Sequence, residues 1–397
     1  MIVYVLNDIH PLRETHMTKR DDILGLRVDQ VGSLLRPQSL IDAFLAFGQG
    51  RSTREHLDTQ VHEAVRGVVA KQERIGFPIV TDGEYARLNW QVSFAEVEGW
   101  ALDDVSWKGF LANPLLRFEH EHSNTRGADA VEVFKTPATA RLRLKSNFPL
   151  QEYQHLAAVA KTPGKAMIMG PDRVSQMCDI AASTPHYADM NAFLGDVVRI
   201  QSDMVGGLID AGCPYVQLDE PSYTGYVDNA TLERIKARGE DPLANLRRAI
   251  AASNGVIAAH QGKAVFGIHI CRGNRASMWH REGTYDGIAE ELFSSLRFDR
   301  LLLEYDTERA GGFEPLRFVP KGPIVVLGLV TTKTGTVETV DMLLKRVEDA
   351  THYVDISQLA ISPQCGFASG LGGNDLSEEQ QWRKLEVLQE TARRAWG

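Results

Sequence analysis

The feature that most constrains the fold is a series of short, nearly all-apolar runs that each end in polar residues. Eight such runs recur along the chain, and most of them are separated by segments with helical periodicity. Runs of this kind are typical of parallel strands that are buried on both faces. The eight runs are Asp29–Ser33, Pro78–Glu84, Lys165–Pro171, Tyr215–Glu220, Ala264–Cys271, Leu301–Asp306, Ile324–Val330 and Leu359–Cys365.

Amphipathic helices are predicted between these runs. Apolar residues recur at helical spacing over 57–68 and 193–208, and a glycine follows each segment as a stop signal. Asp241-Pro242 predicts a helix start, because proline is favoured at the first helical position. A last helix over 378–396 has an acidic first turn and a basic last turn, in agreement with the helix dipole.

Strands that alternate with helices eight times predict a (β/α)8 TIM barrel, and a doubly wound open sheet is the less favoured alternative. Residues 91–150 do not fit the repeat, and 141–145 alternate like one strand of a hairpin. We therefore predict an insertion after the second strand. Residues 1–24 are predicted to form a poorly packed N-terminal arm. No linker or repeat divides 25–397, which predicts one barrel domain.

Composition restricts the partners of such a domain. The formal net charge is -9, so nucleic acid is not expected to bind. The longest apolar run is far shorter than the roughly 20 residues that span a bilayer, which predicts no membrane partner. No basic segment precedes the short apolar stretch at the N-terminus, so a signal peptide is not expected and the cytoplasm is the predicted location.

Polar residues whose side chains can bind metals or take part in catalysis are concentrated at the predicted strand ends. In a barrel these ends form the active site. His269 and Cys271 lie two residues apart on one extended run and therefore point to the same side. Glu304 and Cys365 end two other strands of the same predicted barrel. One imidazole, two thiolates and a carboxylate suit zinc. We predict a Zn²⁺ site at these four residues, and we expect Cys178 and Cys213 to be buried core residues.

The strand-end motifs resemble those of the catalytic half of cobalamin-independent methionine synthase, and most closely the short, single-barrel members of that family. The resemblance covers about residues 25–397. It rests on Gly32-Ser33, Gly83-Glu84, Asp219-Glu220-Pro221, the segment from His269 to Asn274, Leu303-Glu304, the segment from Gly328 to Lys333, and Pro363-Gln364-Cys365-Gly366.

The resemblance implies an S-methyltransferase that makes methionine. In such an enzyme zinc binds the thiol of homocysteine and keeps it as a thiolate, whereas a free thiol with a pKa near 8.5 is mostly protonated at pH 7. By the same matching, Glu84 and Asp219 bind the substrate ammonium and the Ser33 region binds its carboxylate. Lys333 stands where the synthase has its proton-donating histidine. We therefore expect Lys333 to act catalytically by protonating the leaving group.

Two alternatives remain open at this point. Single-barrel proteins with the same motifs include epoxyalkane:coenzyme M transferase, so the reaction is either methyl transfer, from 5-methyltetrahydrofolate or another methyl carrier, or the alkylation of another small thiol. A sulfonate thiol would sit badly near Glu84 and Asp219, which favours homocysteine. The other alternative is a non-catalytic zinc protein. Structural zinc usually binds closely spaced cysteine pairs, and this sequence has none.

Overall fold

Six of the eight predicted strands form one parallel sheet, and they are hydrogen-bonded to one another in chain order. The computed structural model describes residues 20–100 and 135–397. Every residue of the six strands is buried, as expected for strands with helices outside and side chains inside the barrel. The strands are β3 (Lys165–Met169), β4 (Tyr215–Asp219), β5 (Val265–Ile270), β6 (Arg300–Glu304), β7 (Ile324–Val330) and β8 (Leu359–Pro363).

The first two predicted strands are present only as extended segments with single bridges. Val28 pairs in parallel with Ile361 of β8, and Val80 pairs in parallel with Gly164, just before β3. Side chains bridge the remaining gap, because Gln30 Nε2 donates to the carbonyl of Ile79 at 2.8 Å. The ring of strands is therefore closed as a barrel, and the open sheet is excluded.

A glutamine explains why the second of these segments is not a regular strand. Gln72 donates from its amide to the carbonyl of Thr81 at 2.8 Å and accepts from the Thr81 backbone N–H at 3.0 Å. Thr81 Oγ1 in turn donates to the carbonyl of Gly32 at 2.7 Å. These bonds satisfy the backbone groups that a strand ladder would otherwise use, so the prediction of full strands over 29–33 and 78–84 was wrong.

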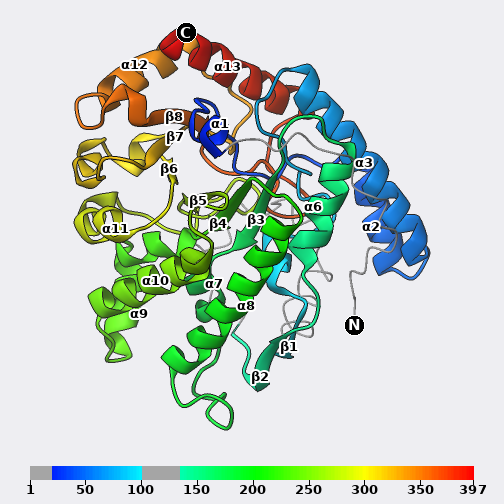
Figure 1. The fold of residues 1–397 in the computed structure, drawn as a ribbon, viewed down its shortest axis with the longest axis vertical. Coiled ribbons are helices and arrows are strands. Elements are labelled where there is room, and N and C mark those ends of the chain that lie inside the picture. Colours follow the sequence, from blue (N-terminus) through cyan, green and yellow to red (C-terminus); the bar gives the residue numbers. More distant parts are fainter. Residues whose placement is uncertain (1–19, 101–134) are drawn as a thin grey trace.

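Helices surround the sheet, as Figure 1 shows, and the predicted helices are confirmed. Asp241 accepts a hydrogen bond from the backbone of Leu243 at the predicted start. Ser377 and Gln380 form a capping box at the start of the last helix. The helices are α2 (Gln38–Gly48), α3 (Arg54–Arg74), α6 (Phe148–Val159), α7 (Pro171–Gln176), α8 (Met190–Asp210), α9 (Asn229–Ala237), α10 (Pro242–Ile257), α11 (Ala289–Ser295), α12 (Val340–Ala350) and α13 (Glu378–Trp396).

A short helix, α1 (Arg20–Leu24), covers the end of the barrel where the strands begin (Figure 1). Ile23 is buried there against Ile79, Tyr215 and Val265. These five residues were predicted to belong to a poorly packed arm, and that boundary was wrong because one buried isoleucine is too little to produce a periodic signal. Residues 1–19 of the predicted arm lie outside the described residues.

The predicted insertion contains a two-stranded antiparallel hairpin, formed by β1 (Val97–Trp100) and β2 (Ala138–Leu144). Residues 101–134 of the insertion lie outside the described residues. Its predicted end at 150 was too late, because α6 begins at Phe148 and packs on α3 and β3 as part of the barrel. No helix in the described part of the chain is both long and apolar enough to cross a lipid bilayer.

Candidate active site

A cavity of about 160 Å³ opens at the end of the barrel where the strands finish. The strand order explains its lining, because the carboxyl ends of parallel strands converge on one rim. Six of the eight predicted site residues line this cavity, and Glu304 and Lys333 do not. The six are Ser33, Glu84, Asp219, His269, Cys271 and Cys365.

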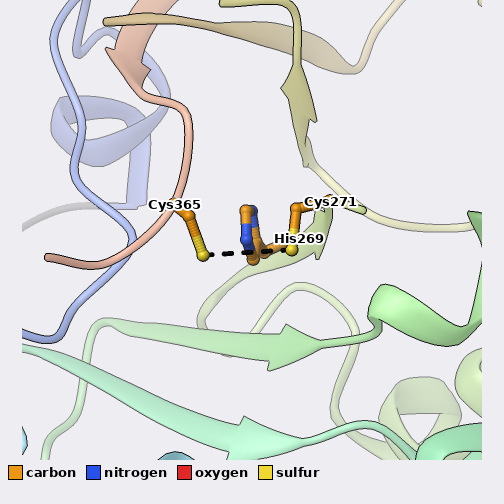
Figure 2. Close-up of side chains that lie close together, drawn as sticks. All are labelled: His269, Cys271 and Cys365. Carbon is orange, nitrogen blue, oxygen red and sulfur yellow. Dashed lines mark hydrogen bonds between the residues drawn. The ribbon is translucent and has the colours of Figure 1, made fainter. Parts of the chain in front are cut away.

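Three of the predicted metal ligands come together at this rim. His269 lies in β5, Cys271 directly follows that strand, and Cys365 follows β8. One ligand atom of each residue lies within 4.8 Å of the others. The two Sγ atoms are 3.9 Å apart, and Figure 2 shows the three side chains directed toward a common point.

The donor atoms of this cluster are available to a metal. Both ring nitrogens of His269 are buried and make no hydrogen bond. The hydrogen bond between the two sulfurs lowers the pKa of Cys365 well below its usual range and raises that of Cys271 well above it. An imidazole and two sulfurs match protein donors of catalytic zinc.

Glu304 lies outside this cluster, although it was predicted to be the fourth ligand. It is the last residue of β6 and is fully buried. Its Oε2 accepts from the backbone N–H of Arg272 at 2.6 Å and from the side-chain amide of Gln364 at 3.0 Å. Its Oε1 makes no hydrogen bond and lies 3.7 Å from an Arg272 nitrogen. The strand-end backbone and Gln364 thus hold one oxygen of the carboxylate, the other makes no hydrogen bond, and the role of Glu304 as the fourth ligand stays a prediction.

Glu84 faces the cavity in a strained backbone conformation, with φ at 59°. Such angles are uncommon for residues other than glycine and are often found at functional sites. Its Oε1 accepts from Arg87 at 3.1 Å, whereas its Oε2 is buried without a hydrogen bond. Burial raises the pKa of Glu84 to about 8.

Asp219 is the second carboxyl group at this cavity, at the last position of β4. Its Oδ1 accepts a hydrogen bond from Gln217 at 2.6 Å. Burial raises the pKa of Asp219 to about 6. Burial disfavours the ionised form of both Glu84 and Asp219. A cation bound beside them would stabilise the two carboxylates.

Ser33 and Lys333 both make bonds to neighbouring loops. Ser33 Oγ accepts from the backbone N–H of Ala368 at 3.3 Å, which fixes the loop after β8. Lys333 does not line the cavity, because its Nζ donates to the carbonyl of Gly273 at 3.0 Å and to Asn274 Oδ1 at 3.1 Å. In this structure Lys333 fixes the loop after β5, and its predicted role as a proton donor stays a prediction.

Several lining residues were missed by the sequence analysis. A glycine-rich segment, 370–373, follows β8, and its composition is a signal that could have been used. The arginines had no signal, because they lie in a short helix and in a loop that are far apart in the sequence. The missed residues include Asn89, Trp90, Gln91, Arg173, Arg275, His280 and Arg281. Cys178 and Cys213 are buried outside this lining, as expected.

Comparison with known sequences identifies relatives of the whole chain. The family model described as "Cobalamin-independent synthase, Catalytic domain" matches residues 139–377. Two Bacillus subtilis proteins of uncharacterized function, YxjG and YxjH, are 36% and 35% identical over 93% and 96% of this chain and 94% and 97% of their own. The methionine synthase of Pyrococcus abyssi is 22% identical over 85% of each chain.

Two solved structures share the fold. A candidate vitamin-B12-independent methionine synthase from Listeria monocytogenes superposes with a TM-score of 0.71 at 26% identity, over 94% of this chain and 98% of that one. A B12-independent methionine synthase from Shewanella sp. W3-18-1, in complex with selenomethionine, has a TM-score of 0.65 at 20% identity over 93% of this chain and 97% of that one. The model match over more than half of the chain and the two Bacillus relatives show that the chain belongs to the cobalamin-independent methionine synthase family.

Proposed function

We propose that the protein is a zinc-dependent S-methyltransferase that converts homocysteine to methionine. The observation that carries this proposal is the cluster of His269, Cys271 and Cys365 in a cavity that also contains two buried carboxyl groups. A thiol acceptor with an ammonium group matches both features. The relatives named methionine synthase support the same acceptor.

The three clustered residues would hold the zinc. A bound zinc supplies a positive charge that lowers the pKa of a coordinated thiol, so that the nucleophile is a thiolate at neutral pH. Glu304, one oxygen of which is held by Arg272 and Gln364, would be the fourth protein ligand, and the substrate thiol would add to the metal or replace this carboxylate.

The chain itself positions the acceptor. Glu84 and Asp219 bind the ammonium and become fully ionised as they do so, because a nearby cation favours the carboxylate form. The resulting bonds are charge-assisted and lie in a cavity where burial strengthens them. The same two carboxyl groups would repel the sulfonate of coenzyme M, which makes that acceptor the less favoured one.

The first experiment measures the metal and the thiol together. The purified protein is expected to contain one zinc per chain, and X-ray absorption at the zinc edge is expected to show one additional sulfur after homocysteine is added. A thiol-consumption assay then crosses homocysteine and coenzyme M with 5-methyltetrahydrofolate, methylcobalamin and an epoxide. A protein without zinc, or one whose metal gains no sulfur from either thiol, contradicts the proposal.

Two cysteine variants provide the matched test. Cys365→Ser is expected to lose most of the zinc and all methyl transfer while the barrel remains folded, because the residue lies at the rim. Cys213→Ser is the control, since this thiol is buried away from the cavity and donates to the carbonyl of Tyr215 at 3.3 Å. Equal zinc contents in the two variants would show that the cluster does not bind the metal.

A further inference from the structure

A buried arginine lies behind the carboxyl group of Glu84. Arg87, three residues further along the chain, is 1% exposed, and its Nη1 donates to Glu84 Oε1 at 3.1 Å. The same guanidinium also contacts Glu152, which lies in α6 and is 5% exposed. One buried cation is therefore shared between two buried carboxyl groups.

Arg87 is shared unequally. Its Nε donates to both carboxylate oxygens of Glu152, at 2.8 and 3.1 Å, and its Nη2 donates to Oε2 at 2.7 Å. Nη2 also donates to the carbonyl of Met167 in β3 at 2.7 Å, which fixes the plane of the guanidinium. Bidentate pairs of this kind are the strongest that arginine makes with a carboxylate. Glu84 accepts a single bond at one oxygen, so most of the positive charge is committed to Glu152.

Two further cations lie near this network, and both are bound to other groups. The guanidinium of Arg36 donates to the backbone carbonyls of Glu84 and Arg87, at 2.7 and 2.8 Å. Lys165 Nζ donates to Asp29 at 2.9 Å. Neither of these bonds reaches the carboxyl group of Glu84, which faces the large cavity.

Two acids also act on Glu84. Asp82 accepts a hydrogen bond from the backbone N–H of Glu84 at 2.9 Å, and Asp219 lines the same cavity. Both disfavour a second negative charge beside them. Burial raises the pKa of Glu84 to about 8 and that of Glu152 to about 7. At neutral pH the proton therefore stays on Glu84, the carboxyl group with the weaker hold on Arg87.

Glu152 does not line the large cavity and does not reach a substrate there. It lines a separate cavity of about 10 Å³, together with Asp82, Arg87 and Lys165. This volume is close to that of one water molecule and excludes an amino acid. Any influence of Glu152 on a substrate must therefore act through Arg87 and Glu84.

We propose that Glu152 is a positioning residue for the acceptor. By holding Arg87 it keeps Glu84 available to the substrate ammonium, and ammonium binding then releases the proton of Glu84 to the solvent. This inference rests on the proposed function, because it deepens the role that Glu84 has there. If Glu152 carried no charge, the whole charge of Arg87 would act on Glu84, which would be ionised before the substrate arrives.

The test counts the protons that are released when the ammonium binds. L-Methionine is the probe, because it carries the ammonium of the proposed acceptor and has no ionisable thiol. Calorimetric titration of zinc-replete protein in two buffers with different enthalpies of ionisation gives this count. At about pH 7 the wild type is expected to release nearly one proton per methionine, because the pKa of Glu84 is about 8. Glu84→Gln should abolish the release.

Glu152→Gln is the decisive variant, because the amide keeps the shape of the side chain and an acceptor for Arg87 but removes the charge. It is expected to release fewer than half as many protons as the wild type. Its affinity for methionine should also vary less between about pH 6 and pH 8. Glu152→Asp, which keeps the charge, should still release nearly one proton. A merely structural role would change the affinity alike at every pH and leave the proton count unaltered.

Asp196→Asn is the matched control. Asp196 lies in α8, is 8% exposed and pairs with Arg141 at 2.9 Å, and it does not line the large cavity. This variant also removes a buried carboxylate that is bound to an arginine. Its proton count and its pH profile should equal those of the wild type.

The inference is overturned if the wild type binds methionine without releasing a proton, a result that does not depend on the folding of any variant. It is also overturned if Glu152→Gln releases as many protons as the wild type. Failure of the proposed function has a different signature, because a protein that contains no zinc, or that binds neither homocysteine nor methionine, is recognised before any protons are counted.

Discussion

Buried charged groups are paired at one end of the barrel and are incompletely hydrogen-bonded at the other. Where the strands begin, Asp29 accepts hydrogen bonds from Lys165 at 2.9 Å, from Tyr215 at 2.9 Å and from Arg300 at 3.0 Å. Burial alone would raise the pKa of Asp29, but Lys165 and Arg300 hold this pKa below its ordinary value. Where the strands finish, Glu84, His269 and Arg173 each have a buried polar atom with no hydrogen bond.

This difference separates stability from function. Buried charges that are fully paired fix the register of the strands, and removing one partner leaves the others uncompensated. Unpaired buried groups cost stability, and where they line a cavity a ligand can complete them. Glu84, His269 and Arg173 all line the cavity at the end where the strands finish. Substitutions at the two ends should therefore have different consequences.

The largest effect is expected at the paired end. Asp29→Ala leaves Lys165 and Arg300 buried without a counter-charge, so the free energy of unfolding should fall by about 3–5 kcal/mol. Urea unfolding measures this change, and zinc per folded molecule should be unaffected. Glu291→Ala, which breaks a surface pair, is the control and should change stability little. An equally small loss for Asp29→Ala would contradict the comparison.

Ile23→Ala tests whether α1 closes the same end. Ile23 is 1% exposed and packs on residues at the starts of β4 and β5. The lost contacts should cost about 2–4 kcal/mol in unfolding free energy. Thermal or urea unfolding checks this value, with homocysteine affinity as the unchanged reference. If stability is unaltered, these residues belong to the arm after all.

At the unpaired end, Glu84→Gln should weaken homocysteine binding about tenfold while the protein remains folded. The pH dependence gives the sharper result. Because the pKa of Glu84 is about 8, wild-type affinity should rise as the pH increases toward and past 8, whereas the variant should show less dependence. Calorimetry at a series of pH values measures both, and parallel pH profiles would exclude Glu84 from the site.

The same raised pKa has a consequence for the ligand-free protein. Folded Glu84 keeps its proton at pH values where the unfolded side chain, with a pKa of 4.5, has lost it. Its contribution to stability is therefore present below 4.5 and is lost as the pH rises from 4.5 to about 8. Unfolding free energies of wild type and Glu84→Gln should converge at low pH. A constant difference across this range would show that Glu84 is already ionised.

The smallest effect is expected for Lys333→Met. The side chain donates to Gly273 and Asn274, so its loss should loosen the loop after β5 by about 1 kcal/mol. The loop also contributes lining residues, and the expected kinetic change is a modest rise in KM with zinc content preserved. A fall in kcat of roughly 10²–10⁴-fold with unchanged KM would instead establish the predicted general-acid role.

Strand ends explain how much of the site was predictable. Six of the predicted residues line one cavity because each closes an apolar run, and parallel strands bring such positions to the same rim. Glu304 also closes a run, yet it is held by Arg272 and Gln364 outside the cluster. Strand-end position thus predicts the neighbourhood of a side chain and leaves its hydrogen-bond partners undetermined.

The sequence by itself determined the repeating strand and helix pattern, the cysteine–histidine cluster and the family, because these follow from spacing along the chain and from short motifs. Only the tertiary structure decided how Gln30 bridges the first two extended segments of the barrel and how Lys333 fixes the loop after β5. These contacts join residues that are far apart in the sequence. Periodicity reports which face of an element is buried, whereas the partner of a buried polar group depends on the elements that the fold places beside it.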